Sequence, residues 1–585
     1  MSPTSLANQS RQAAEAASSK ISALVTSTLV GTAATEAEVR TAPGESSSGS
    51  ANGIASDRDA TLRDVATANR MYYVDLAHTE VDPVALACMA PREVARRQAL
   101  PYAFSGRRLL VAVGEPCDQE TLEELRVVSG HPLRVALTRS DELRGRIKEL
   151  VGLGGGTLDE MSSRAAADVG GEENDDELAN EASVMRLVNE LLSDAFSRRA
   201  SDVHLEPTQD GIVVRYRVDG LLQPEPAPPE IHRFRHAIVS RVKIMAKLNI
   251  AERRMPQDGR IRLKLEDGER DIRVSIIPML HGEGVVMRLL DPRRSVASLS
   301  KLHFPSTMEP TFRSLIRAPH GLILVTGPTG SGKTTTLYSA LAELRGPKTK
   351  IVTIEDPVEY ELDGVNQIQV QPKVGLTFAA GLRSVLRHDP DIILVGEIRD
   401  AETARSAIQA AMTGHLVFST LHTNDAPGAY SRIVDMGIEP YLAAGGILGV
   451  LAQRLVRRLC PHCKVPSALQ DSELPADFPR PWTGQLWEAL GCRECRHSGY
   501  SGRIAIFELM RSDAAVREAC LREDGIRPLY RAAEQGGYKT LRHDGWQKVL
   551  AGLTSVDEVV RVTGMGEGPT SEPTSELMAV EGGEQ

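Results

Sequence analysis

Four short apolar segments stand out in the second half of the chain, each bounded by Gly, Asp or Pro. They are residues 322–326, 351–355, 392–395 and 416–421. Stretches with helical spacing of apolar residues lie between them, such as 334–344 and 401–413. Buried strands that alternate with helices are typical of a mostly parallel sheet covered by helices. The pattern predicts an α/β domain over residues 299–565.

The preceding region, residues 183–298, shows a different pattern. Apolar residues at helical spacing predict a helix over 182–198. After it, apolar and polar residues alternate in segments joined by Asp-Gly turns, which is typical of hairpins. The alternating segments are 211–218, 260–265 and 271–277, with turns at 219–220 and 267–268. We therefore expect an α+β domain rich in antiparallel strands.

A small α/β domain is expected over residues 58–150, where 108–113 has the pattern of a strand and 118–129 that of a helix.

Three segments lack this periodicity. Residues 1–57 are rich in Ser, Ala and Thr, and 566–585 are rich in Gly, Glu and Ser, so both are predicted to be disordered tails. Residues 151–182 are Gly-rich and then acidic, which predicts a flexible linker.

Composition narrows the class of protein. The 585 residues carry a net charge of −10, which argues against a general nucleic-acid binder, so we expect no nucleic-acid partner. No apolar run reaches the roughly 18 residues that a membrane helix needs, and residues 1–51 lack the apolar core of a secretion signal. We expect a cytoplasmic protein that could still dock on a membrane complex.

The strongest motif is Gly327-Pro-Thr-Gly-Ser-Gly-Lys-Thr334, which fits G-x-x-x-x-G-K-[ST] between a predicted strand and a predicted helix. Its glycines let backbone N–H groups point at phosphate oxygens, and the helix adds its positive N-terminal end. Lys333 would reach the β- and γ-phosphates of ATP, and Thr334 would ligate Mg²⁺. The predicted nucleotide-binding residues are Gly327, Pro328, Thr329, Gly330, Ser331, Gly332, Lys333, Thr334 and Thr335.

Acidic residues follow two of the apolar strands. Glu397 ends the segment 391–397 and would hold the Mg²⁺ ion or polarise an attacking water. Glu355 ends the segment 351–355, and Asp356 and Glu359 follow it; we expect a role for this group near the γ-phosphate. Which of Glu397 and Glu359 is the base stays open.

Two C-x-x-C pairs, Cys460/Cys463 and Cys492/Cys495, are separated by 28 residues. Four thiolates from two tight turns suit a closed structural Zn²⁺ site. The alternatives are a redox pair or two unrelated pairs. The gap is longer than usual, and residues 471–481 look like a loop insertion.

The other cysteines and two nearby histidines are less suitable as metal ligands. His462 and His497 are weaker candidate ligands, and Cys88, Cys117 and Cys520 are expected to be small core residues.

Taken together, several ordered motifs resemble the type II secretion and type IV pilus assembly ATPases over residues 183–565. They lie at 199–207, 256–260, 327–334, 355–359, 394–400 and 414–425. The resemblance implies a PAS-like N2 domain, a RecA-like ATPase domain and a homohexamer. It also implies inner-membrane platform proteins as partners, and hence peripheral association with the inner face of the cytoplasmic membrane.

The resemblance further implies roles for individual residues. Glu359 would belong to the Asp box, Glu397 to the Walker B segment, and His415 and His422 to the His box. Arg260 and Arg273 would reach a nucleotide, and Arg383 and Arg387 are weaker candidates for this task.

Residues 58–150 resemble the N-terminal domain of the same family. An Arg-Leu-Gly motif used by some members to bind cyclic di-GMP is missing from this region of the sequence, so we expect it to dock on a platform protein. In the family that this sequence resembles, assembly ATPases commonly carry such a set of four cysteines and retraction ATPases do not, so the resemblance implies an assembly ATPase. The expected function is ATP hydrolysis that drives pseudopilus or pilus assembly. Two alternatives are a DNA-uptake or DNA-transfer ATPase and a non-hydrolysing, nucleotide-dependent scaffold.

Overall fold

The computed structural model describes residues 62–69, 71–151, 182–225, 229–265, 268–290, 298–522 and 525–564. The predicted tails, and the predicted linker apart from its first and last residues, lie outside this range.

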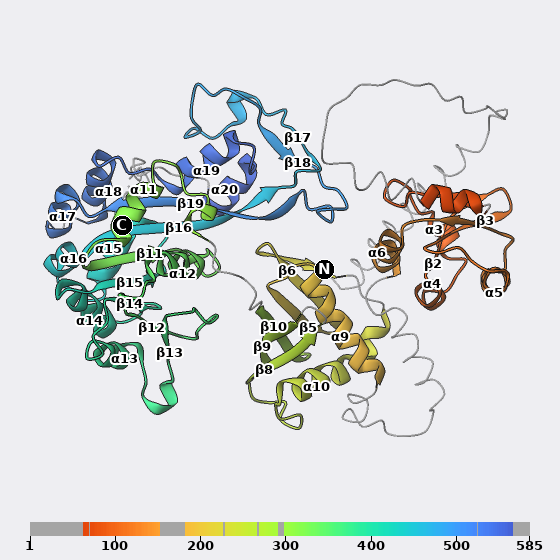
Figure 1. The fold of residues 1–585 in the computed structure, drawn as a ribbon, viewed down its shortest axis with the longest axis horizontal. Helices are drawn as coiled ribbons and strands as arrows, with labels where there is room; N and C mark the ends of the chain where they lie inside the picture. The colour runs from red at the N-terminus through yellow and green to blue at the C-terminus, as the bar shows by residue number, and fades with distance from the viewer. Residues whose placement is uncertain are drawn as a thin grey trace, which may run out of the picture. The chain divides into compact units, whose positions relative to one another are not determined.

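The first domain is a four-stranded sheet with strand order β1-β4-β3-β2 and helices packed against it (Figure 1). Its strands are β1 (Tyr72–Tyr73), β2 (Ala99–Ser105), β3 (Arg108–Val113) and β4 (Leu133–Leu137). Its helices are α3 (Pro83–Leu86), α4 (Pro91–Arg97), α5 (Gln119–Ser129) and α6 (Ser140–Val151). Helix α5 begins where the Asp118 carboxylate accepts the Thr121 N–H, and it ends at Gly130. The predicted strand at 108–113 and helix at 118–129 are confirmed.

The second domain is a six-stranded antiparallel sheet with strand order β7-β6-β5-β10-β9-β8. Its strands are β5 (Asp202–Thr208), β6 (Gly211–Val218), β7 (Leu221–Pro224), β8 (Gln257–Leu265), β9 (Gly268–Met279) and β10 (Gly282–Leu290). Helices α9 (Ala182–Ser197) and α10 (Arg235–Ala246), with the 3₁₀ helix η1 (Pro229–Phe234), share one apolar core with the sheet. The antiparallel prediction is confirmed. At the predicted turn, Asp219 and Gly220 have φ of 49° and 88°, which the tight hairpin between β6 and β7 requires.

The third domain is built on a seven-stranded sheet with strand order β13-β12-β14-β15-β11-β16-β19 (Figure 1). The strands are β11 (Gly321–Thr326), β12 (Ile351–Glu355), β13 (Asn366–Gln369), β14 (Ile392–Val395), β15 (Leu416–Leu421), β16 (Ile447–Leu459) and β19 (Tyr500–Arg511). All neighbours are parallel except the β16–β19 pair. The predicted mostly parallel sheet is therefore confirmed.

Helices and 3₁₀ turns connect these strands. Their bounds are η2 (Leu299–Leu302), α11 (Glu309–Ile316), α12 (Lys333–Leu344), η3 (Pro372–Val374), α13 (Phe378–Val385), α14 (Ala401–Met412), α15 (Ala426–Asp435), α16 (Pro440–Gly446), α17 (Ala514–Leu521), α18 (Ile526–Gln535), α19 (Leu541–Leu550) and α20 (Val556–Thr563). Successive residues of a strand face opposite sides, so the central strands contribute to two cores. Leu322 and Leu324 pack with residues of α14, whereas Ile323 and Val325 pack with residues of α12. Burial on both sides explains why these strands appear as continuous apolar runs.

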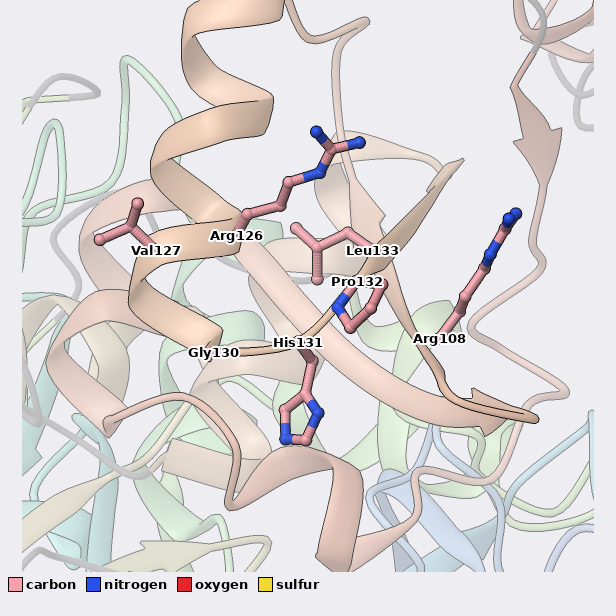
Figure 2. Close-up of a pocket in the computed structure, with 7 residues that line it drawn as sticks. All are labelled: Arg108, Arg126, Val127, Gly130, His131, Pro132 and Leu133. Atoms are coloured by element: carbon pink, nitrogen blue, oxygen red, sulfur yellow. The ribbon is translucent and has the colours of Figure 1, made fainter.

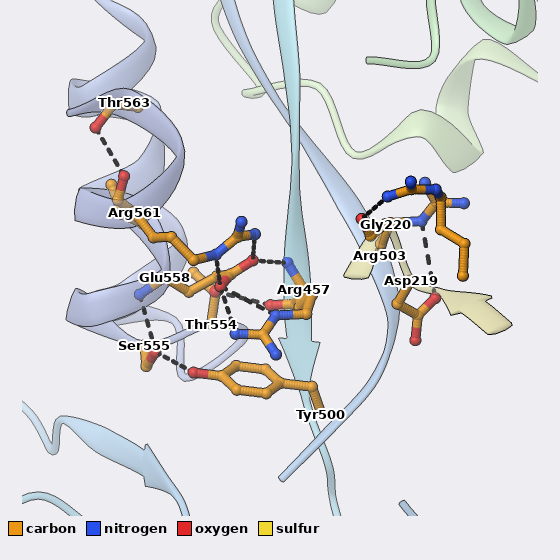
Figure 3. Close-up of polar contacts among 12 residues, drawn as sticks. Asp219, Gly220, Arg457, Tyr500, Arg503, Thr554, Ser555, Glu558, Arg561 and Thr563 are labelled. Atoms are coloured by element: carbon orange, nitrogen blue, oxygen red, sulfur yellow. Dashed lines mark hydrogen bonds and ion pairs between the residues drawn. The ribbon is translucent and has the colours of Figure 1, made fainter. Parts of the chain in front are cut away.

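The C-terminal helix α20 is fastened to β16 by a buried carboxylate. Glu558 is 1% exposed and accepts hydrogen bonds from the backbone N–H and guanidinium of Arg457 and from the guanidinium of Arg561 (Figure 3). Beside it, the Tyr500 hydroxyl lies 2.7 Å from that of Ser555. These contacts hold the outer part of the sheet to the end of the domain.

The expected loop insertion at 471–481 is a packed segment. The 3₁₀ turn η4 (Asp471–Glu473) opens with a capping box, and Leu474 and Phe478 are buried against Trp546 of α19. None of the described helices is both long and apolar enough to cross a membrane.

Candidate functional site

The four motifs singled out in the third domain all follow the carboxyl ends of parallel strands. Gly327 follows β11, Asp356 follows β12, Gly396 follows β14 and His422 follows β15. Strand β15 pairs with both β11 and β14, and β14 pairs with β12. The motifs therefore meet along one edge of the sheet, where ligands of open α/β sheets bind.

The glycine loop is shaped by conformations that only glycine adopts easily. Gly327 has φ of 142°, and a Cβ there would lie 2.4 Å from the backbone oxygen of Gln453. Gly332 has φ of 91° and is the N-cap of α12. A side chain at either position would force the loop off the neighbouring strand β16. The loop thus wraps tightly around the N-terminus of α12, which favours anions.

Lys333 lies across the loop that precedes it. Its ammonium donates to the carbonyl oxygens of Gly327 at 2.7 Å and Pro328 at 3.1 Å. Burial lowers its pKa to about 8; the negative charge of Glu397 works against this shift, and the positive charge of Arg454 adds to it. Thr334 and Thr335 occupy the first turn of α12 behind the lysine.

Glu397 belongs to a group of side chains at the carboxyl ends of the strands, here called the strand-end cluster, which also contains Lys333, Arg399 and His422. Its side chain is 14% exposed, and one oxygen lies 2.6 Å from the Arg399 guanidinium while the other lies 3.5 Å from Nε2 of His422. The pKa of His422 is lowered by burial and by the charge of Lys333, while Glu397 raises it. The structure therefore brings Glu397, His422 and Lys333 into one electrostatic group.

The acids at the end of β12 and after it have two different environments. Glu355 is 5% exposed and accepts hydrogen bonds from the hydroxyls of Tyr338 and Thr353 and the amide of Gln367. The hydrogen bond from Tyr338 joins β12 to α12, and both carboxylate oxygens of Glu355 already have partners. Glu359 is more open, with a side chain that is 38% exposed.

Two of the four arginines singled out from the sequence come from the second domain. Arg273 of β9 lies 3.6 Å from a carboxylate oxygen of Glu359 and donates to the backbone oxygen of Val358 at 3.1 Å. Arg260 of β8 instead forms a bidentate pair with Asp271, at 2.9 and 2.5 Å, and its pKa is raised by these hydrogen bonds. Arg273 therefore contacts the acidic segment that follows β12, whereas Arg260 pairs within its own domain.

The other two arginines belong to α13 and the turn after it. Arg383 pairs with Glu402 of α14, and Arg387 donates to the backbone oxygen of Arg383 at 2.8 Å. Both contacts are exposed, and neither involves Glu397, His422 or Lys333.

The two histidines of the expected His box lie at opposite ends of β15. His422 follows the strand and contacts Glu397, as described above. His415 precedes the strand, and its ring lies 3.0 Å from the backbone oxygen of Ala410 at the end of α14. Six extended residues separate them, so the structure does not bring His415 to the strand-end cluster.

Strand β16 supplies site residues that the sequence pattern missed. Arg454 lies close enough to affect the pKa of Lys333 and donates to the Asn424 side chain at 3.0 Å. Its neighbour Gln453 is 2% exposed although it is an amide. Gln453 and Arg454 interrupt the apolar run over residues 447–456, and this interruption is the signal that could have pointed to the position.

The four paired cysteines form a compact sulfur cluster next to the small hairpin of β17 (Lys464–Pro466) and β18 (Trp487–Ala489). Their ligand atoms all lie within 4.8 Å of one another, with Cys460–Cys492 at 3.9 Å, Cys463–Cys495 at 3.6 Å and Cys492–Cys495 at 3.7 Å. Tetrahedral zinc with Zn–S bonds of about 2.3 Å places its sulfurs about 3.8 Å apart. The donor set therefore fits a tetrahedral metal ion, and the sulfurs are much too far apart for a disulfide.

The thiols of the cluster lie in different electrostatic surroundings. Burial raises the pKa of Cys463 to about 12, whereas N–H donors from Cys492 and Gly499 outweigh burial and lower the pKa of Cys495 to about 7. His462 and His497 are exposed and do not belong to the cluster.

The remaining cysteines are spread over two cores. Cys520 is buried in the core of the third domain, as expected, while Cys88 and Cys117 are half-buried at the edge of the core of the first domain.

The first domain carries a separate basic hollow. Its lining residues are Arg108, Arg126, Val127, Gly130, His131, Pro132 and Leu133. Figure 2 shows the side chains of Arg126 and Arg108 on either side of Pro132 and Leu133, with His131 turned away from both. Arg126 is already paired with Glu123 at 2.5 Å. This hollow lies on α5, β3 and the start of β4, and it shares no residue with the strand-end cluster.

Comparison with protein families gives two matches. Residues 177–561 match the family described as type II/IV secretion system protein, and residues 69–157 match the MshEN domain.

Similar curated proteins span most of the chain. The type IV pilus assembly ATPase PilB of Myxococcus xanthus is 43% identical over 506 residues, covering 83% of this chain and 88% of that protein. Type II secretion system protein E of Xanthomonas campestris is 45% identical, with 79% and 82% covered. The type II secretion system ATPase E of Vibrio cholerae is 42% identical, with 81% and 98% covered.

Proposed function

We propose that this chain, which belongs to the family of type II/IV secretion system proteins, hydrolyses ATP to drive the assembly of a pilus or of a pseudopilus for secretion. One observation carries the proposal. The glycine loop and Glu397 follow strands that both pair with β15, and the charges of Lys333 and Glu397 influence each other. A phosphate group bound by the loop would lie beside the acid that is needed for hydrolysis.

Each residue has a distinct task in this proposal. The loop N–H groups and Lys333 bind the phosphates, and Thr334 with Glu397 would hold Mg²⁺, which supplies charge neutralisation at the phosphates. Glu397 and His422 then orient the attacking water, because a carboxylate beside a weakly basic imidazole suits proton transfer near neutral pH. The pair formed by Arg273 and Glu359 joins the second domain to the site, so that domain movement would change the charge near the γ-phosphate.

The cysteine cluster is proposed to bind one structural Zn²⁺ ion through Cys460, Cys463, Cys492 and Cys495. The support is the tetrahedral spacing of the four sulfurs.

The working assembly is proposed to be a homohexamer at the inner face of the cytoplasmic membrane, held there by platform proteins. The names of the relatives support a role in secretion or pilus assembly. The basic hollow on the first domain offers Arg108 for an acidic surface of a platform protein. A variant that lacks residues 1–180 should keep ATPase turnover and lose secretion or piliation, and unimpaired secretion or piliation by it would contradict this docking role.

ATPase assays of single variants test the proposed chemistry. Lys333→Ala and Glu397→Gln should each reduce kcat at least a hundredfold, since removal of one preorganised charge costs about 3 kcal/mol in a transition state. The matched control variants are Lys348→Ala and Glu361→Gln, which remove exposed charges of the same type. If the purified wild type shows no activity that Lys333→Ala removes, the chain is a nucleotide-dependent scaffold. A DNA-uptake motor would give the same ATPase results. It would be distinguished by a strain that lacks this protein, because that strain would lose DNA transfer.

A further inference from the structure

Gln453 is a buried amide at the glycine loop that lies outside every motif recognised in the sequence. It belongs to β16, the neighbour of β11 in the sheet, and is 2% exposed. Burial of an amide without hydrogen-bond partners would reduce the free energy of unfolding by about 1–3 kcal/mol, so the partners of this side chain matter.

Both ends of the Gln453 side chain are hydrogen-bonded to the phosphate-binding segment. Nε2 donates to the backbone oxygen of Ser331 at 2.8 Å, and Oε1 accepts from the hydroxyl of Thr336 at 2.7 Å. The orientation of the amide is fixed, because the Ser331 oxygen only accepts and must face the NH₂ group. The side chain therefore bridges the loop and the first turn of α12.

The contact with Ser331 determines the direction of a neighbouring N–H group. In a trans peptide, the C=O and the N–H lie on opposite sides of the chain. When the Ser331 oxygen points at Gln453, the N–H of Gly332 points the other way, away from the Gln453 side chain. Gly332 tolerates this orientation because its φ is 91°, and a Cβ there would lie 2.7 Å from Nε2 of Gln453.

We infer that Gln453 is a positioning residue for phosphate binding, which sets the peptide between Ser331 and Gly332 so that its N–H faces a nucleotide phosphate. The strand that carries it is also held from a second element. Four residues further along, Arg457 is fastened to Glu558 of α20. This inference rests on the proposed function and adds a residue through which β16 determines the affinity for nucleotide.

The test compares Gln453→Leu with the wild type in the full-length protein. Leu fills a similar volume and removes both hydrogen bonds. We expect the Kd for a fluorescent ADP analogue and the KM for ATP to rise about tenfold, because one hydrogen bond of this kind contributes about 1.4 kcal/mol. The value of kcat should change less than threefold.

The split between KM and kcat separates positioning from general stability. A variant that merely unfolds in part would lose active molecules, so kcat would fall while KM stayed unchanged. The control variant Tyr216→Phe removes a buried hydrogen bond to the Leu191 carbonyl in the second domain, and its KM should match the wild type. Wild-type Kd and KM in Gln453→Leu, or a loss of kcat alone, would overturn the inference.

A second pair of variants decides the matter if Gln453→Leu does not fold. Thr336→Ser keeps the hydroxyl that orients the amide and should keep KM within twofold, whereas Thr336→Val should raise it severalfold. Equal KM values for these two variants would overturn the inference. If the wild type binds ADP but does not hydrolyse ATP, the proposed function fails, and the ADP affinities of the same variants still test the role of Gln453.

Discussion

Replacing Glu558 by Gln should release α20 from β16, and the structure allows the size of this effect to be worked out. The side chain is completely buried, and its two oxygens accept hydrogen bonds from two guanidinium groups and one backbone N–H. Arg457 is 16% exposed and would lose its counter-ion, whereas Arg561 is 44% exposed and would be rescued by water.

Breaking a fully buried ion pair costs about 3–5 kcal/mol, and an exposed one costs under about 1 kcal/mol. Because one partner is buried, the other is half-exposed, and Gln keeps an acceptor for the backbone, we expect about 2–3 kcal/mol. This corresponds to a roughly 30- to 150-fold rise in local opening.

Hydrogen exchange of the amides in Val556–Thr563 and of Arg457 measures this opening directly. The matched control is Glu518→Gln, which removes an exposed i,i+4 pair with Arg522 on α17 and should raise exchange of its helix less than threefold. If Glu558→Gln raises exchange of α20 no more than this control raises that of α17, the carboxylate does not anchor the helix.

The same residue predicts a pH dependence with a definite sign. Burial alone would raise the pKa of Glu558, but hydrogen bonds from Arg561 and Arg457 outweigh it and leave the pKa below its ordinary value. The stabilisation is therefore fully present above the unfolded pKa of about 4.3 and is lost as pH falls through the folded pKa. The difference in exchange between wild type and Glu558→Gln should shrink over that acidic range, and a difference that stays constant would contradict the charge-based explanation.

Three further predictions concern the site itself. Because burial lowers the pKa of Lys333 to about 8, nucleotide affinity should fall toward tenfold per pH unit above pH 8. Lys333→Arg should abolish this fall because Arg stays charged, which isothermal titration at several pH values above 7 would check. Cys463→Ser should lower the zinc content from about one ion per chain to well below it by atomic emission, while Cys520→Ser keeps one ion; equal zinc in both would exclude the sulfur cluster as the metal site. Arg273→Gln and Glu359→Gln should reduce kcat non-additively in a double-mutant cycle, since the two side chains pair, and additive losses would show that they act independently.

Local patterns were enough to predict the three folded regions and the core of the candidate site. Continuous apolar runs such as 392–395 predicted strands buried on both faces, and alternation at 211–218 predicted antiparallel ones, because each pattern reflects burial along a few consecutive residues. The glycine loop was recognisable for the same reason, since its conformation depends on glycines within eight residues. The spacing of the cysteines predicted their cluster because each pair grips a metal from one turn.

The sequence was less informative wherever a side chain's role depends on residues far along the chain. Glu355 and Glu359 look alike in sequence, and only the packing of Tyr338 and Gln367 around Glu355 separates a buried structural acid from an accessible one. The segment 471–481 looks like a loose insertion until Trp546 packs against it.

What the sequence determined by itself was the candidate chemistry carried on contiguous residues: the glycine loop, the acid after β14 and the cysteine pairs. The tertiary structure decided which of the remaining polar residues reach that chemistry. It separated His422 from His415 by the length of a strand, and it placed Gln453, which is 122 positions from Ser331, against the loop. The physical reason is that hydrogen bonds between distant segments depend on the order of the strands in the sheet. Local sequence patterns do not predict that order.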